Sequence, residues 1–494
     1  MARFFALLGM PPSIDVILNA VKDLSVLTNL RKMVEYTLSE LLASFHDTLR
    51  LEKIPAPVID AAKLHILDSL GCVLAGSRLE PGKLAYNLAV AASGGNAAST
   101  LFGSSLRASY LDAVQAMATA AHCGELDDIH GGAATCIGGM IIPALLAIAE
   151  KYGGSGRRFL EATVAGYETV VRVGLSIDAP KLFARGWWPS TVCGAFGVAA
   201  AGAKFLAWPA DKTANALGIA ALHSGGMLTG GNEGATARHL AFGRAAQNGI
   251  LALLATEQGL SGPKRVFEDP RGFCLTLCAE PRWEFLQSFD GYFLPEVAFK
   301  PFPCARQLHA GVEALLKLMA QHSLSVDSIR EIELAVPTQN ASMVDRPATP
   351  TLRAATLGSG QYVMAVTALR GKIDLASFEE EYLQSEQVRR LMAKVKVSAS
   401  AELDRHFPKY WPARVTVRFT DGQERIKEII APKGESENPM TRQDVEEKFL
   451  GLAGPLFGER KARLIIEEVS SIDSRDSLAR LLGMLSTAVG AVGD

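Results

Sequence analysis

The chain has 494 residues, of which 48% are hydrophobic and 21% are charged, and its formal net charge is −2. This length exceeds what one ordinary hydrophobic core organises, so a soluble globular protein with at least two domains is expected. The small net charge offers no electrostatic attraction to nucleic acid or to an anionic membrane surface, so we predict neither as a partner.

Three features predict a cytoplasmic location. The apolar run at residues 4–8 is too short for a secretory signal and has no cleavage site of small residues, which indicates a non-exported tail. The apolar stretch 137–149 contains Pro143 and falls short of the ~20 residues that span a bilayer, so we predict a buried helix there. The seven cysteines are scattered, odd in number and without paired CxxC motifs, which favours free thiols in a reducing compartment.

Residues up to about 290 are predicted to be helical almost throughout. Apolar side chains at positions 59, 62, 66, 70 and 73 recur every three or four residues, which indicates one face of a helix that begins after Pro55 and Pro57. The alanine-rich residues 196–205 and the residues 245–254 indicate two more helices, the second ended by Gly259.

Strand patterns begin after about residue 325. Residues 332–336 alternate between apolar and charged or small side chains, as a half-buried strand does. The same alternation recurs at 415–419, and the following Asp421-Gly422 pair predicts a two-residue hairpin turn. Helices are predicted between these strands at 361–369 and 375–391.

The last part of the chain returns to a helical pattern. Thr441 and Asp444 have the spacing of a capping box, and apolar residues then recur at helical intervals. We therefore predict a mostly α fold: a large all-α helical domain built from residues 1–295 and 438–494, with an inserted α+β lid domain at 296–437.

Residues 125–130 contain four ionisable side chains within a short segment. Glu125, Asp127, Asp128 and His130 directly precede a strongly apolar stretch, so they are either organised around something they bind or form a solvated, capped helix end. Carboxylates and an imidazole together can carry acid–base chemistry. Glu125, Asp128 and His130 could also bind a metal together with His122, but their spacing matches no established metal signature, so we predict no metal site.

Several segments in order resemble the MmgE/PrpD family. They are residues 125–130 (ELDDIH), 186–190 (GWWPS), 238–246 (RHLAFGRAA), 262–263 (GP), 300–304 (KPFPC) with His309, 345–347 (DRP) and 359–362 (SGQY). The resemblance runs roughly from residue 35 to 490. It implies a homodimer without cofactor that acts on a small polycarboxylate, in a cleft between a helical domain and a lid.

The chain departs from the pattern of that family at four positions. Cys136 and Trp188 stand where the resemblance leads us to expect histidines, Arg238 where a lysine is usual, and Ile129 where threonine or tyrosine is common. Cys136 is either a small buried side chain or a thiol that takes part in proton transfer. Trp188 narrows the pocket, which makes a citrate-type tricarboxylate a less favoured substrate.

The resemblance and the residue types together suggest roles. Lys300 and Arg238 suit carboxylates, and His130, Cys136 and Tyr362 suit proton exchange. The predicted catalytic set is His130, Cys136, Lys300, Tyr362 and Asp128. The predicted substrate-binding set is Arg238, Glu125, Asp127, Trp188, His309 and Arg346. The glycine-rich residues 225–234 are expected to form a flexible active-site loop.

The favoured function is a cofactor-independent lyase, a dehydratase or decarboxylase, that moves a proton α to a carboxylate of a small di- or tricarboxylic acid. Two alternatives stay open. An epimerase would use two proton-exchanging groups on opposite faces of one carbon, such as Cys136 facing His130 or Tyr362. A member of the family that has lost catalysis would serve as a binding or structural protein.

Overall fold

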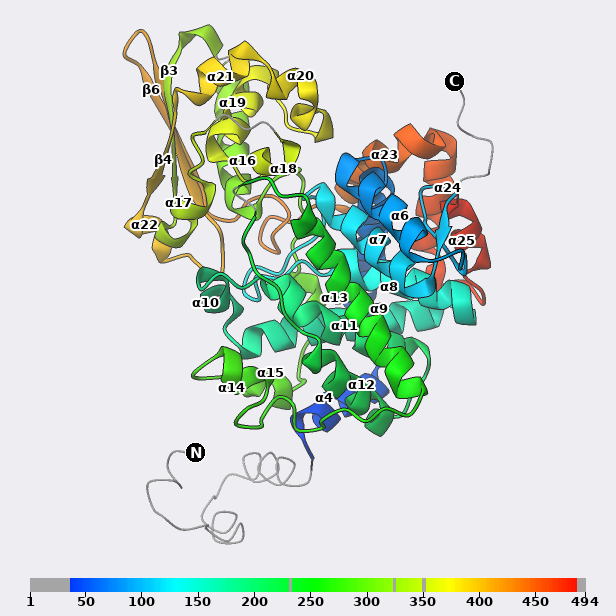
Figure 1. Cartoon of the computed structure of the whole chain (residues 1–494). Coiled ribbons are helices and arrows are strands. Elements are labelled where there is room, and N and C mark those ends of the chain that lie inside the picture. Colours follow the sequence, from blue (N-terminus) through cyan, green and yellow to red (C-terminus); the bar gives the residue numbers. More distant parts are fainter. Residues whose placement is uncertain (1–35, 231–232, 323–325, 349–351, 487–494) are drawn as a thin grey trace, which may run out of the picture.

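The structure is a computed structural model that describes residues 36–230, 233–322, 326–348 and 352–486. The stretch at residues 4–8, predicted to be a non-exported tail, lies outside the described residues. Figure 1 shows two bodies, a large helical domain and a smaller domain that carries a sheet with helices on one side. The prediction of a mostly α chain with a small α+β part is confirmed.

The helical domain contains the first part of the chain and its last helices. Its elements are α4 (Leu38–Thr48), α5 (Ala56–Gly76), α6 (Glu80–Ala92), β1 (Ser99–Thr100), β2 (Arg107–Ala108), α7 (Tyr110–Cys123), α8 (Gly138–Tyr152), α9 (Gly156–Ser176), α10 (Ala179–Ala184), α11 (Pro189–Phe205), α12 (Ala210–Leu222), α13 (Ala237–Glu257), α14 (Phe273–Leu277), α15 (Glu284–Gln287), η1 (Leu294–Glu296), α23 (Arg442–Phe457), α24 (Glu459–Ser470), η5 (Ile472–Ser474) and α25 (Ala479–Leu485).

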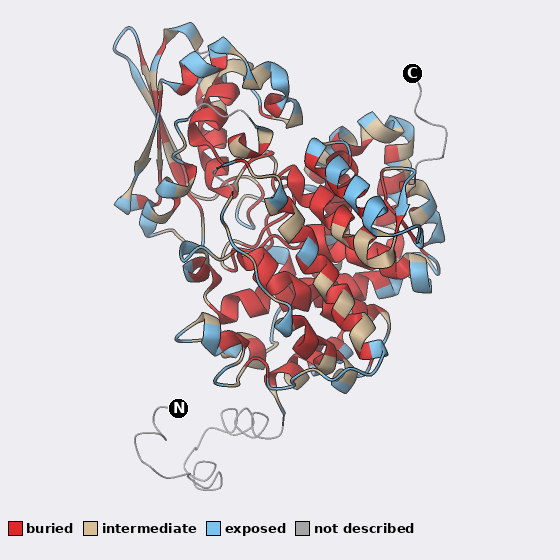
Figure 2. Cartoon of the chain, viewed as in Figure 1, coloured by how far each residue is buried: buried red, intermediate tan, exposed pale blue. Residues whose placement is uncertain are grey.

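Small side chains explain how the central helices approach one another. The helix α11 packs between α9 and α13, and it is buried almost along its whole length. A Cβ atom at Gly197 would stand 2.2 Å from Val170 of α9, and one at Gly249 would stand 2.5 Å from Val198. These glycines therefore let the helices lie close together, and the centre of the domain is buried in Figure 2.

The lid is formed by one continuous segment of the chain. Its elements are η2 (Arg306–Leu308), α16 (His309–His322), η3 (Val326–Ser328), β3 (Ile329–Val336), α17 (Thr338–Val344), α18 (Arg353–Thr356), α19 (Gly360–Arg370), η4 (Leu375–Phe378), α20 (Glu380–Leu383), α21 (Glu386–Met392), β4 (Val395–Ala399), α22 (Ala401–Asp404), β5 (Ala413–Phe419) and β6 (Glu424–Ile429). The four strands form a sheet in the order β4-β3-β5-β6.

The predicted strands and hairpin of the lid are confirmed. In β3 the apolar residues 332, 334 and 336 are buried, and β3 pairs parallel with β4 and antiparallel with β5. The strands β5 and β6 form an antiparallel hairpin, and Gly422 has φ +86° in its turn. The predicted two-residue turn is wrong in length, because the N–H of Phe419 donates to the carbonyl of Gln423 and the turn therefore spans residues 420–422. The capping box of Thr441 and Asp444 is also present at the start of α23.

One helix prediction needs correction. Residues 375–391 do not form one helix but three short ones, η4, α20 and α21. Asp374 and Ser377 bond reciprocally in the first turn, the backbone of Glu379 is extended, and Ser385 caps a new start. Local side-chain hydrogen bonds therefore interrupt a segment whose apolar spacing suggests a continuous helix.

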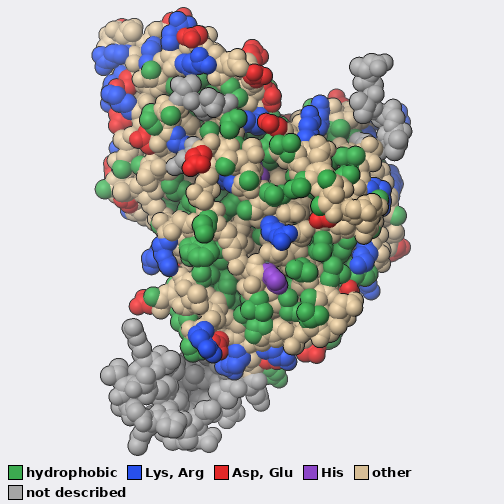
Figure 3. All heavy atoms as spheres, in the orientation of Figure 1, with side chains coloured by type: hydrophobic (Ala, Val, Ile, Leu, Met, Phe, Trp, Pro, Cys, Tyr) green, Lys and Arg blue, Asp and Glu red, His purple; other side chains and the backbone are tan. Residues whose placement is uncertain are grey.

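Two hydrophobic cores follow this division of the chain. One takes its residues from 38 to 299 and from 440 to 485 and also includes Trp411, whereas the other takes them from 304 to 429. All seven cysteines lie in the described part of the chain, and none forms a disulfide. Among the described residues no helix is long and apolar enough to cross a membrane. On the face in Figure 3, positive and negative side chains are interspersed over the lid.

Candidate active site

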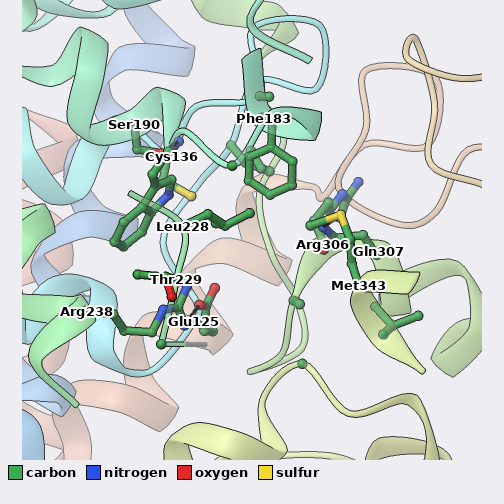
Figure 4. A pocket seen from close by; sticks show the side chains of 18 of the residues that line it. Glu125, Cys136, Phe183, Ser190, Leu228, Thr229, Arg238, Arg306, Gln307 and Met343 are labelled. Atoms are coloured by element: carbon green, nitrogen blue, oxygen red, sulfur yellow. Dashed lines mark hydrogen bonds and ion pairs between the residues drawn. The ribbon is translucent and has the colours of Figure 1, made fainter. Parts of the chain in front are cut away.

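A cavity of about 500 Å³ lies where the two domains meet. Figure 4 shows Glu125, Cys136 and Arg238 on one side of it, and Arg306, Gln307 and Met343 of the lid on the other. Residues that line the cavity are His122, Glu125, Ile129, Ala134, Cys136, Phe183, Gly186, Trp188, Ser190, Met227, Leu228, Thr229, Gly230, Glu233, Arg238, Lys300, Ala305, Arg306, Gln307, Ser342, Met343, Val344, Arg346, Gly358 and Trp411.

A short antiparallel bridge brings together two distant segments of the chain. The N–H of Ile129 donates to the carbonyl of Ala298 at 2.9 Å, and the N–H of Ala298 donates back at 2.8 Å. Residues 125–130 therefore run beside residues 298–300. As a result, Lys300 lies next to the carboxylates that follow α7.

Lys300 is a buried cation in the lining of the cavity. Its side chain is 1% exposed, and its Nζ atom lies 3.4 Å from Oε2 of Glu125 and 3.6 Å from Oδ1 of Asp127. Burial alone would lower the pKa of Lys300, but the neighbouring Cys136, Asp127 and Glu125 outweigh burial and raise it. The ammonium group is therefore charged.

Glu125 is held ionised by its surroundings. Burial raises its pKa, but the charges of His122, Lys300 and Arg238 have the larger combined effect and hold it well below its usual range. Arg238 Nη1 donates to Oε1 of Glu125 at 3.0 Å. Glu125 also has a left-handed backbone with φ +52°, which is uncommon for a residue with a side chain and occurs at functional sites.

The two positions where histidines were expected both line the cavity. The thiol of Cys136 lies 3.6 Å from Nζ of Lys300, and the backbone N–H of Cys136 donates to Oγ of Ser190 at 3.0 Å. Burial raises the pKa of Cys136 well above its ordinary value. The indole ring of Trp188 lies under the guanidinium of Arg238, with 5.1 Å from Cζ to the ring centroid, so it supports that cation.

Arginines from both domains reach the cavity. Arg238 comes from α13, whereas Arg306 and Arg346 come from the lid. Burial and the charge of Arg238 together lower the pKa of Arg346 to about 10, although the charge of Glu125 acts in the opposite direction. The Nε atoms of Arg238 and Arg306 are buried and make no hydrogen bond. An anion between these groups would relieve their repulsion and accept their hydrogen bonds.

Two residues predicted to be catalytic lie beside the cavity, not in its lining. Asp128 accepts the backbone N–H groups of residues 137 and 138 at the start of α8, and it contacts His65 at 2.7 Å and Tyr167 at 2.6 Å. His130 accepts the N–H of Ala133 through Nδ1. The expectation that both line the cleft is therefore not met. Backbone N–H groups and buried side chains engage the carboxylate of Asp128, and Nε2 of His130 lies 3.8 Å from the carboxylate of Glu296.

The lid residues Tyr362 and His309 also lie outside the lining. Tyr362 is buried in the lid core and donates its hydroxyl proton to the carbonyl of Ser377 at 2.9 Å. His309 contacts the carbonyl of Cys304 through Nε2 at 3.1 Å and Nη1 of Arg306 through Nδ1 at 3.2 Å. His309 therefore helps to position an arginine of the cavity, whereas the hydroxyl of Tyr362 is already bonded within the lid.

His122 lines the cavity but is absent from the predicted catalytic and binding sets. Its Nδ1 atom lies 3.0 and 2.9 Å from the two carboxylate oxygens of Asp127. The sequence offered one signal, since His122 stands three residues before Glu125 and so falls within reach of it at the end of a helix. Asp127 itself is buried behind the lining and reaches the cavity only through His122 and Lys300.

Arg306, Ser190 and the loop 227–230 are further lining residues outside the predicted sets. Arg306 follows the KPFPC motif by two residues, and Glu435 pairs with its guanidinium. The glycine-rich loop is tied to the segment before α11, because the N–H of Trp188 donates to the carbonyl of Gly226 at 3.0 Å. The predicted active-site loop therefore does border the cavity.

A metal ion does not suit the donor atoms of the cavity. His122, Asp127 and Cys136 each have one potential ligand atom within 4.8 Å of the others. However, the ammonium of Lys300 lies 3.6 Å from both Asp127 and Cys136 and would repel a cation there.

Comparison with known proteins gives matches along most of the chain. The model of the MmgE/PrpD N-terminal domain matches residues 40–286, and that of the MmgE/PrpD C-terminal domain matches residues 302–473. The cis-aconitate decarboxylase-like protein oryM of Aspergillus oryzae is 30% identical, over 90% of this chain and 96% of that protein.

Two further relatives carry established enzyme names. The cis-aconitate decarboxylase of Homo sapiens is 28% identical, over 92% of this chain and 95% of the relative. The 2-methylcitrate dehydratase of Salmonella typhimurium is 26% identical over a smaller share, 46% of this chain and 49% of the relative. Both decarboxylases and dehydratases of this kind are lyases.

Proposed function

The chain belongs to the MmgE/PrpD family, and from this premise we propose that it is a cofactor-independent lyase that decarboxylates a small di- or tricarboxylic acid. One observation carries the proposal: four cations, Arg238, Lys300, Arg306 and Arg346, converge from both domains on a cavity of about 500 Å³. A volume of this order suits a small ligand, and paired guanidinium groups suit carboxylates.

In the proposed reaction the arginines hold carboxylates that do not react. One carboxylate leaves as carbon dioxide, and the electron pair of the broken C–C bond stays on the carbon. A neighbouring carboxylate next to Lys300 would share that charge, because a buried ammonium stabilises developing negative charge better than water does. A proton then completes the product. The same α-carbanion also allows loss of water, which is the dehydratase form of the reaction.

The share of the chain that each relative matches favours decarboxylation over dehydration. The decarboxylases match over about nine tenths of this chain, whereas the dehydratase matches less than half of it. The epimerase alternative pairs Cys136 with His130 or Tyr362 across the substrate. Neither His130 nor Tyr362 lines the cavity. The lining therefore supports a lyase better than a two-sided proton exchange by those pairs.

The test is incubation of the full chain with a panel of polycarboxylates in deuterated water, followed by NMR. The panel includes cis-aconitate, 2-methylcitrate, citrate and smaller dicarboxylates. We expect release of carbon dioxide and a product with one carboxylate fewer. Loss of water with all carboxylates retained would establish a dehydratase. Exchange of a C–H proton for deuterium without a new product would indicate an epimerase. Binding without any change would support a non-catalytic member.

A further inference from the structure

His122 combines three features that a proton-exchanging imidazole needs. It lines the cavity, it is 2% exposed, and its Nε2 atom makes no hydrogen bond. Its other ring nitrogen, Nδ1, lies about 3 Å from both oxygens of the Asp127 carboxylate. Because Asp127 accepts the proton of Nδ1, the ring is oriented and Nε2 is left for a second partner.

The ring of His122 is also fixed by packing. It stacks on Phe242 with 4.2 Å between centroids and 12° between planes, and it lies 5.2 Å from the ring of Trp188. A side chain held by stacking and by a carboxylate loses little freedom when substrate binds. Such preorganisation is what places a catalytic group within reach of one carbon atom.

The surroundings of Nε2 join proton exchange to carboxylate binding. Oε1 of Glu125 lies 3.6 Å away, and that carboxylate in turn contacts Arg238 and Lys300. The sulfur of Cys136 lies within 4.8 Å of one nitrogen of the same ring. A carboxylate held by the cations would therefore place its α-carbon near the imidazole.

We propose that His122 is the catalytic acid–base group of the cavity and that Asp127 is its positioning residue. This inference rests on the proposed lyase function and names the group that moves the proton. After the C–C bond to the departing carboxylate breaks, Nε2–H gives its proton to the carbon that keeps the electron pair. The new C–H bond forms, and the ring regains a proton from water. In a dehydration, Nε2 would instead remove the α-proton.

This assignment also accounts for the two missing histidines. Cys136 and Trp188 stand where the resemblance led us to expect imidazoles, yet the cavity still contains one, and Trp188 packs against it. The buried His239 is its natural comparison. Its ring lies 5.7 Å from that of His122, but it does not line the cavity.

The experiment compares His122→Ala, His122→Gln and His239→Phe in the full chain, with the panel polycarboxylate that wild type converts fastest. We expect both His122 variants to lower kcat by about 10²–10⁴-fold. Binding of tricarballylate, which has three carboxylates but neither a hydroxyl group nor a C=C bond, should change by less than threefold. His239→Phe should keep kcat within threefold. Added imidazole should raise the kcat of His122→Ala at least tenfold.

Asp127 is tested through that rescue. The double variant His122→Ala/Asp127→Asn should show no rescue by imidazole, because nothing then orients the added ring. Conversion by wild type together with kcat of His122→Gln above a tenth of wild type would overturn the assignment and leave the lyase function standing. Absence of rescue in a folded His122→Ala that still binds tricarballylate would also overturn it. No conversion of any panel member by wild type would overturn both proposals.

Discussion

The Nζ atom of Lys300 lies 3.6 Å from the Sγ atom of Cys136, so the cation and the thiol form one group in the lining of the cavity. They are far apart in sequence and belong to segments joined by the bridge between Ile129 and Ala298. The same ammonium also balances the buried carboxylates of Glu125 and Asp127. Its substitution should therefore affect both activity and stability.

Lys300→Ala is expected to lower turnover by about two to three orders of magnitude, because it removes a charge that stabilises the transition state. It should also cost about 3–5 kcal/mol in the free energy of unfolding, since buried carboxylates lose their partner. Adding Glu125→Gln should recover part of that stability without restoring turnover. Thermal unfolding and steady-state kinetics check both points. Turnover of Lys300→Ala near that of wild type would remove Lys300 from the mechanism.

Cys136→Ser is expected to leave the pH dependence of kcat unchanged. Burial raises the pKa of the thiol well above its ordinary value, so the sulfur keeps its proton at neutral pH and is a poor base. A hydroxyl can still accept a hydrogen bond from Lys300. The measurement is a pH–rate profile of both proteins between pH 5.5 and 9. If the pH at which kcat of Cys136→Ser rises or falls differs from that of wild type, the thiol takes part in proton transfer.

Gly358→Ala tests the contribution of Arg346. A Cβ atom at this position would stand 2.8 to 3.0 Å from the guanidinium of Arg346 and would displace it. We expect KM to rise about tenfold or more, as for the loss of a charged hydrogen bond, with a smaller effect on kcat. Gly451→Ala is the matched control, because no atom lies within 4 Å of its new Cβ. Equal KM values for the two variants would contradict a role for Arg346 in substrate binding.

His130→Gln and Tyr362→Phe are expected to keep kcat within threefold, because neither side chain lines the cavity. Tyr362→Phe removes the hydrogen bond to the carbonyl of Ser377, which should lower the free energy of unfolding by about 0.5–1.5 kcal/mol. Kinetics and chemical denaturation measure these effects. A hundredfold loss of kcat in either variant, with the fold preserved, would return that residue to the catalytic set.

His46 gives a stability prediction that depends on pH. Burial lowers its pKa from 6.5 to about 3, so below pH 6.5 the unfolded chain takes up a proton that the folded chain does not. Wild type therefore loses about 1.4 kcal/mol per pH unit from this residue as the pH falls below 6.5. His46→Gln has no group that causes this loss. The free energy of unfolding of wild type minus that of His46→Gln should therefore decrease from pH 7 to pH 5.

The comparison with His46→Gln cancels groups that titrate in the same range. Burial raises the pKa of Glu168 to about 7, and this carboxyl stabilises the folded state as the pH falls from 7 towards 4.5. Because Glu168 is present in both proteins, its contribution drops out of the difference. Denaturant unfolding at several pH values provides the measurement. A difference that stays constant from pH 7 to 5 would contradict the lowered pKa of His46.

The sequence pattern correctly predicted the helices, strands and caps that depend on interactions between residues close together in the chain. The apolar spacing after Pro55, the alternation at 332–336, the turn at Gly422 and the cap at Thr441 all reflect steric and hydrogen-bonding preferences within a few residues. The same kind of reasoning failed for 375–391, where side-chain hydrogen bonds of Asp374 and Ser385 divide a helical pattern.

Residue types and their spacing are enough to predict a mostly helical chain with a small sheet domain, the family resemblance, and several of the charged residues that reach the cavity. Which polar atoms face that cavity depends on contacts between distant segments of the folded chain. Asp128 and His130 bond to backbone N–H groups, whereas the neighbouring His122 has Nε2 without a partner. The choice depends on a backbone bridge from Ile129 to Ala298 and on Asp127 behind the ring, which are contacts that spacing along the chain does not encode.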